Sequence, residues 1–305
     1  MRIVVMGAGG VGGYFGARLQ QAGNEVAFIA RGRHLEALRK NGLALRSALG
    51  DARLEVRVFE DPADAGPAEA VIFAVKLWDT ESAAARIRPL VEGGAYVIPF
   101  QNGVESVGRL GAALGRDRVL GGAAHIATHI FAPGVIEHTG NFARLAFGPL
   151  APAQRPLAEA FLAACLGAGI DARIPDDIVR VIWEKFVFLV GISGACALAR
   201  APIGVVRADA DLRWLLEAAM RETWQVARKR GIALADDFVA EQVGLADSFH
   251  ADMRPSLLHD LEAGGKLEAP WLCGAVARMA REAGLDAPAN RAIYAALQPY
   301  VEGRR

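Results

Sequence analysis

The sequence has few cysteines and no excess of either charge. Its three cysteines, Cys165, Cys196 and Cys273, are widely spaced and odd in number, which indicates neither a disulfide framework nor a zinc knuckle. Lysine plus arginine equals aspartate plus glutamate, at 34 residues each. A chain without net charge has no overall field that would attract nucleic acid or an anionic membrane surface. We therefore expect neither partner, and a reducing cytoplasm is the simplest compartment.

The sequence also lacks a hydrophobic run of membrane-spanning length. Its longest strongly apolar uncharged run, Phe186 to Ala199, is 14 residues long and contains two glycines. A membrane span needs about 20 apolar residues. The first residues do not show the apolar stretch and cleavage site of a signal peptide. We expect a soluble protein in which the 186–199 run is a buried core helix.

What the sequence does have is a glycine-rich beginning, MRIVVMGAGGVGGYFG. It predicts a strand at 3–6 that turns into a helix, which is the order of a dinucleotide-binding βαβ unit. In that unit Gly7 makes the tight turn, Gly9 lets the backbone approach a pyrophosphate, and Gly12 lets the helix pack close to the strand. The predicted cofactor-binding turn comprises Gly7, Ala8, Gly9, Gly10, Val11 and Gly12.

The end of the second predicted strand, 25–30, indicates which dinucleotide is bound. An NAD-binding unit usually carries Asp or Glu there, to accept hydrogen bonds from the ribose hydroxyls. This chain has Arg31-Gly-Arg33 instead. A guanidinium can bind a 2′-phosphate through two hydrogen bonds, so the pattern favours NADP (NADPH) as the cofactor.

The remaining periodicity predicts an α/β domain with a mostly parallel sheet at 1–174 and an all-α domain at 175–305. Continuous apolar runs at 70–75 and 95–100 are typical of parallel strands covered on both faces. The runs at 119–130, 135–138 and 143–147 predict an antiparallel extension of the same sheet. Beyond Pro175, helices are predicted at 177–198, 208–230, 237–245, 255–262, 271–283 and 290–301.

Residues at the carboxyl ends of parallel strands are candidates for one crevice. Besides the glycine turn, these are Arg31, Lys76 and Asn102. Lys185, in the apolar segment IWEKFVFLV, is the best-placed proton donor for a carbonyl reduction, since partial burial would lower its pKa. His125 and His129 lack an H-E-x-x-H pattern, so no metal site is expected.

Seven segments together resemble the ketopantoate reductase (2-dehydropantoate 2-reductase) family, nearly from end to end. They are MGAGGVGGYFGARL, ARGRHLEALRKNGL, VKLWDT, QNGVES, PGVIEHTG, IWEKF and PSLLHDLEAGGKLE. The resemblance implies a Rossmann domain followed by a helical domain like that of 6-phosphogluconate dehydrogenases. It also implies NADPH-dependent reduction of 2-dehydropantoate to pantoate, a step of pantothenate biosynthesis. The long apolar helices are compatible with a homodimer.

The resemblance further implies a role for each candidate. Lys185 would supply the proton, and Asn102 would hold that lysine, the substrate and the cofactor. Ser256 would bind the substrate carboxylate, and Glu268 would accept a hydrogen bond from the substrate hydroxyl. Lys76 would lie near the cofactor.

Four positions depart from the family pattern. Leu189 and Ser193 stand where the family usually carries asparagines, and Pro270 and Cys273 interrupt its E-x-D-x-x-N-G pattern after the glutamate. Ser193 is kept as a candidate substrate-binding residue, but a leucine cannot replace an amide, and each lost hydrogen bond would cost about 1–3 kcal/mol. The alternatives are therefore a reductase of a more apolar 2-oxo acid, a catalytically inactive NADPH-binding sensor, or a hydroxyacid or opine-type dehydrogenase that uses NAD.

Overall fold

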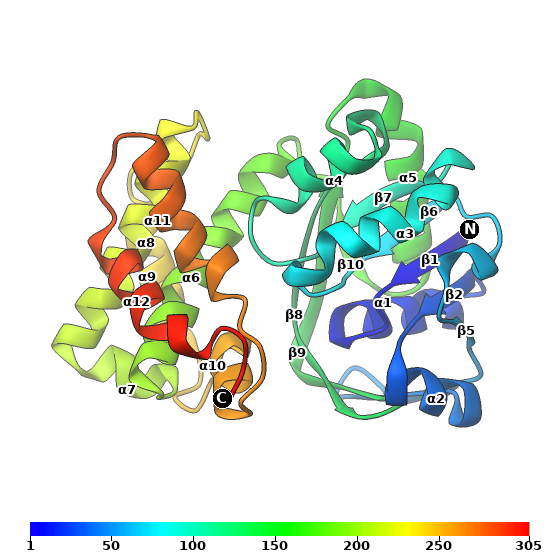
Figure 1. The fold of residues 1–305 in the computed structure, drawn as a ribbon, viewed down its shortest axis with the longest axis horizontal. Helices are drawn as coiled ribbons and strands as arrows, with labels where there is room; N and C mark the ends of the chain where they lie inside the picture. Colours follow the sequence, from blue (N-terminus) through cyan, green and yellow to red (C-terminus); the bar gives the residue numbers. More distant parts are fainter. Residues whose placement is uncertain (305) are drawn as a thin grey trace. The chain divides into compact units, whose positions relative to one another are not determined.

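The computed structural model describes residues 1–304, and these residues divide into two compact units (Figure 1). The first unit comprises residues 1–101 and 105–181, and the second comprises residues 102–104 and the chain from Ile182 onward. The boundary predicted between residues 174 and 175 stays a prediction about the functional domains.

A parallel sheet in the order β5-β2-β1-β6-β7 forms the centre of the first unit. Its strands are β1 (Arg2–Met6), β2 (Glu25–Ile29), β5 (Arg57–Phe59), β6 (Ala70–Phe73) and β7 (Tyr96–Pro99). The helices and 3-10 turns that connect them are α1 (Gly10–Gln21), α2 (Gly32–Asn41), η1 (Pro62–Ala65), η2 (Leu77–Asp79), α3 (Thr80–Glu92), α4 (Ser106–Leu114) and η3 (Arg116–Arg118).

The apolar runs of the sequence form this sheet because both of its faces are buried. Along β1, Ile3 and Val5 belong to one hydrophobic core, whereas Val4 and Met6 belong to another. Successive side chains of a strand point to opposite faces, so a strand covered on both sides must be apolar throughout. The predicted α/β domain with a mostly parallel sheet is thereby confirmed.

The predicted antiparallel extension of this sheet is wrong, since those strands belong to a second sheet in the order β10-β9-β3-β4. β8 pairs antiparallel with β9, whereas β3 and β10 pair parallel with β9. The physical reason is that β9 faces α1: Ile136 lies in the core that α1 shares, and a Cβ at Gly13 would come within 2.9 Å of its Cγ1. The elements are β3 (Leu43–Ser47), β4 (Ala52–Leu54), β8 (Gly121–Ala132), β9 (Val135–Gly148), η4 (Pro152–Gln154), α5 (Arg155–Gly167) and β10 (Asp171–Arg173).

The second unit is built from helices, as predicted. α6 (Ile178–Ala199) is apolar and long enough to cross a membrane by composition alone, but 72% of its most apolar window is buried inside the protein. It contributes Phe186, Val190 and Cys196, all fully enclosed, to the core of this unit. The other elements of the unit are α7 (Ile203–Ala208), α8 (Ala210–Lys229), α9 (Phe238–Ser248), α10 (Ser256–Glu262), η5 (Ala269–Trp271), α11 (Cys273–Glu282), α12 (Pro288–Leu297) and η6 (Gln298–Tyr300).

A buried carboxylate of α8 forms hydrogen bonds with the first turn of α12. Glu222, 8% exposed, accepts hydrogen bonds from the backbone N–H groups of Ala289 at 2.7 Å and Asn290 at 2.9 Å, and from Asn290 Nδ2 at 2.7 Å. The first turn of a helix has N–H groups without intrahelical partners and a partial positive charge. Glu222 therefore caps α12 from a neighbouring helix.

Candidate functional site

The chain segments that follow β1, β2 and β6 begin at the same edge of the first sheet. Met6 is paired with both Ile29 and Phe73, so these three strands end level with one another. The backbone continues the pairing, because Gly7 N–H donates to Ile29 O and Ala74 N–H donates to Met6 O. The glycine turn, Arg31 and Lys76 thus all follow strands that end at one edge of the first unit.

The three glycines of the turn differ in their surroundings as a dinucleotide-binding turn requires. Gly7 has a φ of +101°, which favours glycine. At Gly12 a Cβ would lie 2.2 Å from Gly7 O, so α1 packs against the turn more closely than a side chain allows. At Gly9 a Cβ would meet nothing within 4 Å. The backbone is therefore open at Gly9, where a pyrophosphate would have to approach.

The N-terminus of α1 has the properties of an anion site. Gly9 is its N-cap and, within residues 1–304, no side chain caps it and no acidic residue lies in its first turn. Free N–H groups and the helix dipole favour a negatively charged group at such an end. This end of α1 therefore fits the pyrophosphate of a dinucleotide.

His34 supports the turn from α2, a role that the sequence did not reveal. Its Nδ1 accepts a hydrogen bond from Gly134 N–H at 3.1 Å, so its Nε2 carries the proton and donates it to Ala8 O at 2.9 Å. Burial lowers the pKa of His34 below 6.5, which favours this neutral form. In the sequence, the one indication that His34 lies near the cofactor turn was its position three residues after Arg31.

Arg31 is engaged in an ion pair. Its Nη2 lies 2.6 Å from Oδ2 of Asp79, a residue of η2 that the sequence did not single out. Lys76 is exposed, and its ammonium lies 5.6 Å from the centre of the Trp78 ring. The adenosine-recognising arginine predicted from the sequence thus faces a carboxylate.

In the second unit, Lys185 lies in the third turn of α6 and its Nζ donates to Asn102 Oδ1 at 3.0 Å. Desolvation by burial lowers the pKa of Lys185 to about 8, and the nearby Glu268 carboxylate offsets part of that effect. Glu268 itself is 7% exposed and immediately precedes η5. Three of the predicted site residues are therefore close together in one unit.

The departing residue Leu189 and the candidate Ser193 follow Lys185 at helical spacing on the same face of α6. Leu189 is half-buried and packs against the core. Ser193 is 1% exposed, and its hydroxyl has no hydrogen-bond partner in the described part of the chain. Ser256 lies at the start of α10 and is exposed. Substrate binding by Ser193 and Ser256 stays a prediction.

The region that follows Glu268 is apolar, and Ala269, Leu272 and Cys273 in it are buried. Cys273 is 1% exposed and its thiol donates to Ala269 O at 3.5 Å, while burial raises its pKa to about 12. Pro270 lies in η5. Cys273 is therefore a packing residue here rather than a nucleophile.

The described residues contain no group of three or more His, Cys, Asp and Glu side chains that could hold a metal ion. His129 lies across from Glu137 in the β8–β9 hairpin, with Nε2 3.4 Å from Oε2. Two side chains are fewer than the three or four protein ligands of a zinc site.

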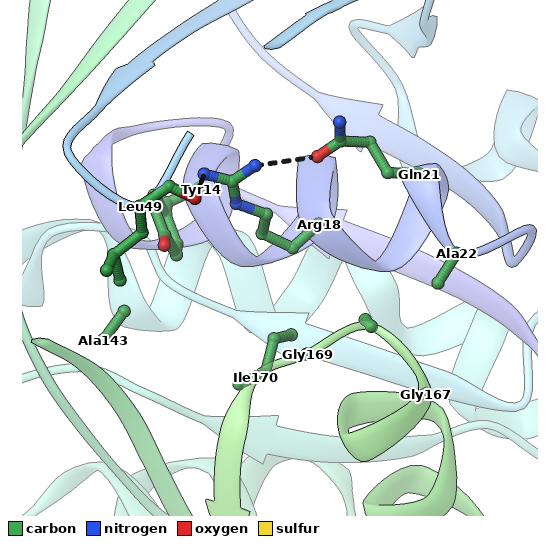
Figure 2. A pocket seen from close by; sticks show the side chains of 10 residues that line it. Tyr14, Arg18, Gln21, Ala22, Leu49, Ala143, Gly167, Gly169 and Ile170 are labelled. Atoms are coloured by element: carbon green, nitrogen blue, oxygen red, sulfur yellow. Dashed lines mark hydrogen bonds between the residues drawn. The ribbon is translucent and has the colours of Figure 1, made fainter. Parts of the chain in front are cut away.

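A hollow of about 380 Å³ lies beside the C-terminal half of α1. Arg18 is one of the residues that line it (Figure 2). Its Nη1 donates to Gln21 Oε1 at 3.0 Å, and its Nη2 donates to the main-chain carbonyls of Leu49 and Gly50. None of the predicted cofactor-binding residues lines this hollow. It is distinct from the glycine turn at the other end of α1.

Comparisons of the sequence with known proteins point to one family. Residues 3–152 match the family model "Ketopantoate reductase PanE/ApbA", and residues 177–301 match "Ketopantoate reductase PanE/ApbA C terminal". The chain is 30% identical to the uncharacterized oxidoreductase YkpB of Bacillus subtilis, over 98% of this chain and 99% of that protein. It is 31% identical to the 2-dehydropantoate 2-reductase of Archaeoglobus fulgidus, over 96% and 95%.

Among solved structures, the 2-dehydropantoate 2-reductase of Geobacter metallireducens superposes with a TM-score of 0.91 at 31% identity, and the match covers 98% of this chain and 99% of that one.

Proposed function

The chain belongs to the ketopantoate reductase family, and on that premise we propose that it reduces a 2-oxo acid to the 2-hydroxy acid with NADPH. The observation that supports this most strongly is the Lys185–Asn102 pair. A lysine whose pKa is lowered to about 8 is a stronger acid than an exposed lysine, so it gives up a proton more readily near neutral pH. Reduction of a carbonyl requires such a proton donor.

The first unit would hold the dinucleotide. The uncapped N-terminus of α1 and the open backbone at Gly9 fit the pyrophosphate, and Arg31 has the charge to bind a 2′-phosphate. Ala8, Gly10, Val11 and Lys76 complete the proposed cofactor site. When bound, the cofactor supplies a hydride to the 2-oxo carbon.

The second unit would supply the proton. Lys185 donates a proton from Nζ to the carbonyl oxygen as that oxygen gains negative charge, and the lysine is left neutral. Asn102 fixes the position of Nζ through its 3.0 Å hydrogen bond. Glu268 accepts a hydrogen bond from the substrate hydroxyl, and Ser256 binds the substrate carboxylate.

2-Dehydropantoate is the first candidate substrate, which would place the chain in pantothenate biosynthesis, because relatives matched along nearly their whole length are named for that reaction. A more apolar 2-oxo acid is the second candidate. It is favoured by Leu189, which follows Lys185 by one turn and offers neither a donor nor an acceptor.

The test follows the loss of nicotinamide absorbance of NADPH with 2-dehydropantoate, 2-oxoisovalerate and 4-methyl-2-oxopentanoate. Fastest turnover of 2-dehydropantoate supports the first candidate, and preference for the two unhydroxylated acids supports the second. Binding of NADPH without turnover of any 2-oxo acid would overturn the enzymatic proposal in favour of a cofactor-binding sensor.

A further inference from the structure

The ion pair between Arg31 and Asp79 connects the ends of two strands that flank β1. Arg31 follows β2, and Asp79 follows β6 through η2. Their side chains are 63% and 23% exposed, and Arg31 Nη2 and Asp79 Oδ2 lie 2.6 Å apart. The carboxylate is therefore the more enclosed partner, and the guanidinium is the one that reaches solvent.

Asp79 is also the N-cap residue of α3, yet its carboxylate makes no capping hydrogen bond within the described residues. An aspartate at this position usually accepts hydrogen bonds from the first turn of its own helix. Here its carboxylate bonds Arg31 instead. Asp79 thus places a negative charge on the arginine that the sequence assigned to a 2′-phosphate.

This arrangement has opposite consequences for the two nicotinamide dinucleotides. A 2′-phosphate is an anion that competes with the Asp79 carboxylate for the guanidinium and is repelled by it. A free 2′-hydroxyl is a hydrogen-bond donor, which a carboxylate can accept. Arg31 thus has the charge to bind a 2′-phosphate, and Asp79 has the acceptor for a free 2′-hydroxyl.

We propose that Asp79 is a specificity-determining residue. Its carboxylate competes with the 2′-phosphate of NADPH for Arg31 and accepts a hydrogen bond from the free 2′-hydroxyl of NADH, so that the chain binds NADH as well as NADPH. The proposal rests on the proposed function in that it takes the first unit to bind a nicotinamide dinucleotide. It adds that Arg31 alone does not set the preference.

The test measures the dissociation constants of NADPH and NADH by calorimetry, without a 2-oxo acid, for the wild type and Asp79→Asn. 2′,5′-ADP and 5′-ADP serve as probes of the adenosine end alone. Removal of the charge is expected to tighten NADPH and 2′,5′-ADP by about tenfold and to weaken NADH by about threefold. The control is Asp171→Asn, which breaks the exposed Arg144–Asp171 pair of the same unit, and it should leave all four constants unchanged.

Weaker NADPH binding in Asp79→Asn would mean that Asp79 positions Arg31 for the phosphate, and it would overturn the proposal. An unchanged ratio of the NADPH and NADH constants would also overturn it. Circular dichroism of both variants checks that they fold. Absence of turnover with every 2-oxo acid would contradict the proposed reduction but would not alter these binding constants, so the two failures are distinguishable.

Discussion

Lys185 Nζ and Asn102 Oδ1 lie 3.0 Å apart, although 83 positions separate the two residues in the chain. Asn102 lies shortly after β7, which ends at Pro99, yet it belongs to the second compact unit together with Lys185. A neutral amide oxygen accepts a hydrogen bond from the ammonium and fixes its position without adding a charge. This pair is the proposed proton-donating apparatus.

Lys185→Ala is expected to lower turnover of the best 2-oxo acid by about 10²–10⁴-fold, the usual contribution of a general acid. The dissociation constant of NADPH should stay within about twofold of wild type, because all the proposed cofactor residues except Asn102 lie in the first unit. Lys266→Ala is the matched control, since Lys266 is an exposed lysine of the same unit paired with Glu302 at 2.6 Å. Turnover that survives in Lys185→Ala would remove Lys185 from the mechanism.

The pH profile of reduction should descend above pH 8, where Lys185 loses the proton that it must donate. Because Glu268 raises the pKa of Lys185 against the larger effect of burial, Glu268→Gln should move the descending limb of kcat/KM to lower pH. Glu302→Gln, which removes an exposed carboxylate of the same unit, should leave it in place. A descending limb that moves to higher pH in Glu268→Gln would contradict the assigned interaction.

Leu189→Asn should change which substrate is preferred. An amide one turn beyond Lys185 offers the donor and acceptor that leucine lacks, and each hydrogen bond gained is worth about 1 kcal/mol, or roughly fivefold. The ratio of kcat/KM for 2-dehydropantoate to that for 2-oxoisovalerate is therefore expected to rise by about fivefold. Leu189→Met, which keeps an apolar side chain of similar size, serves as the control. Equal ratios in all three proteins would show that position 189 does not face the substrate.

His34 should make stability depend on pH. Burial lowers its pKa in the folded state below 6.5, so the unfolded chain binds the proton more readily. Stabilisation by neutral His34 is thus complete above pH 6.5 and is lost as the pH falls through the lowered value. His34→Gln keeps a donor for Ala8 O but does not titrate, so its free energy of unfolding in urea should fall less than that of wild type below pH 6.5.

His250→Gln is the control for this experiment, because the side chain of His250 is 83% exposed. It should retain the acid sensitivity of the wild type. If His34→Gln lost as much stability in acid as the wild type, another group would be responsible.

Glu222→Ala should destabilise the second unit by about 2–4 kcal/mol, because it leaves the first N–H groups of α12 and the Asn290 amide without their charged acceptor. Glu217→Ala, on the same helix but with a partly exposed side chain paired with Arg221, should cost no more than about 1 kcal/mol. Urea unfolding monitored by circular dichroism compares the two. Similar midpoints for both variants would contradict the capping role.

Much of the fold could be predicted because hydrophobic periodicity is a local property. The continuous apolar run of β1 and the turn at Gly7 identified a buried parallel strand, and the apolar stretch of α6 identified a core helix. The sheet to which β8 and β9 belong was not predictable in this way. Strand pairing depends on which faces of remote elements pack together, and here Ile136 packs on α1, which directs these strands into a second sheet.

By itself, the sequence determined the strand–turn–helix with its three glycines, the helical second unit, and the side chains available for chemistry, because these depend on neighbouring residues. Only the tertiary structure decided that Asn102 binds Lys185, that burial lowers the pKa of that lysine, and that Asp79 faces Arg31. Hydrogen bonds, ion pairs and desolvation act over a few ångströms in space, and separation along the chain does not specify that distance.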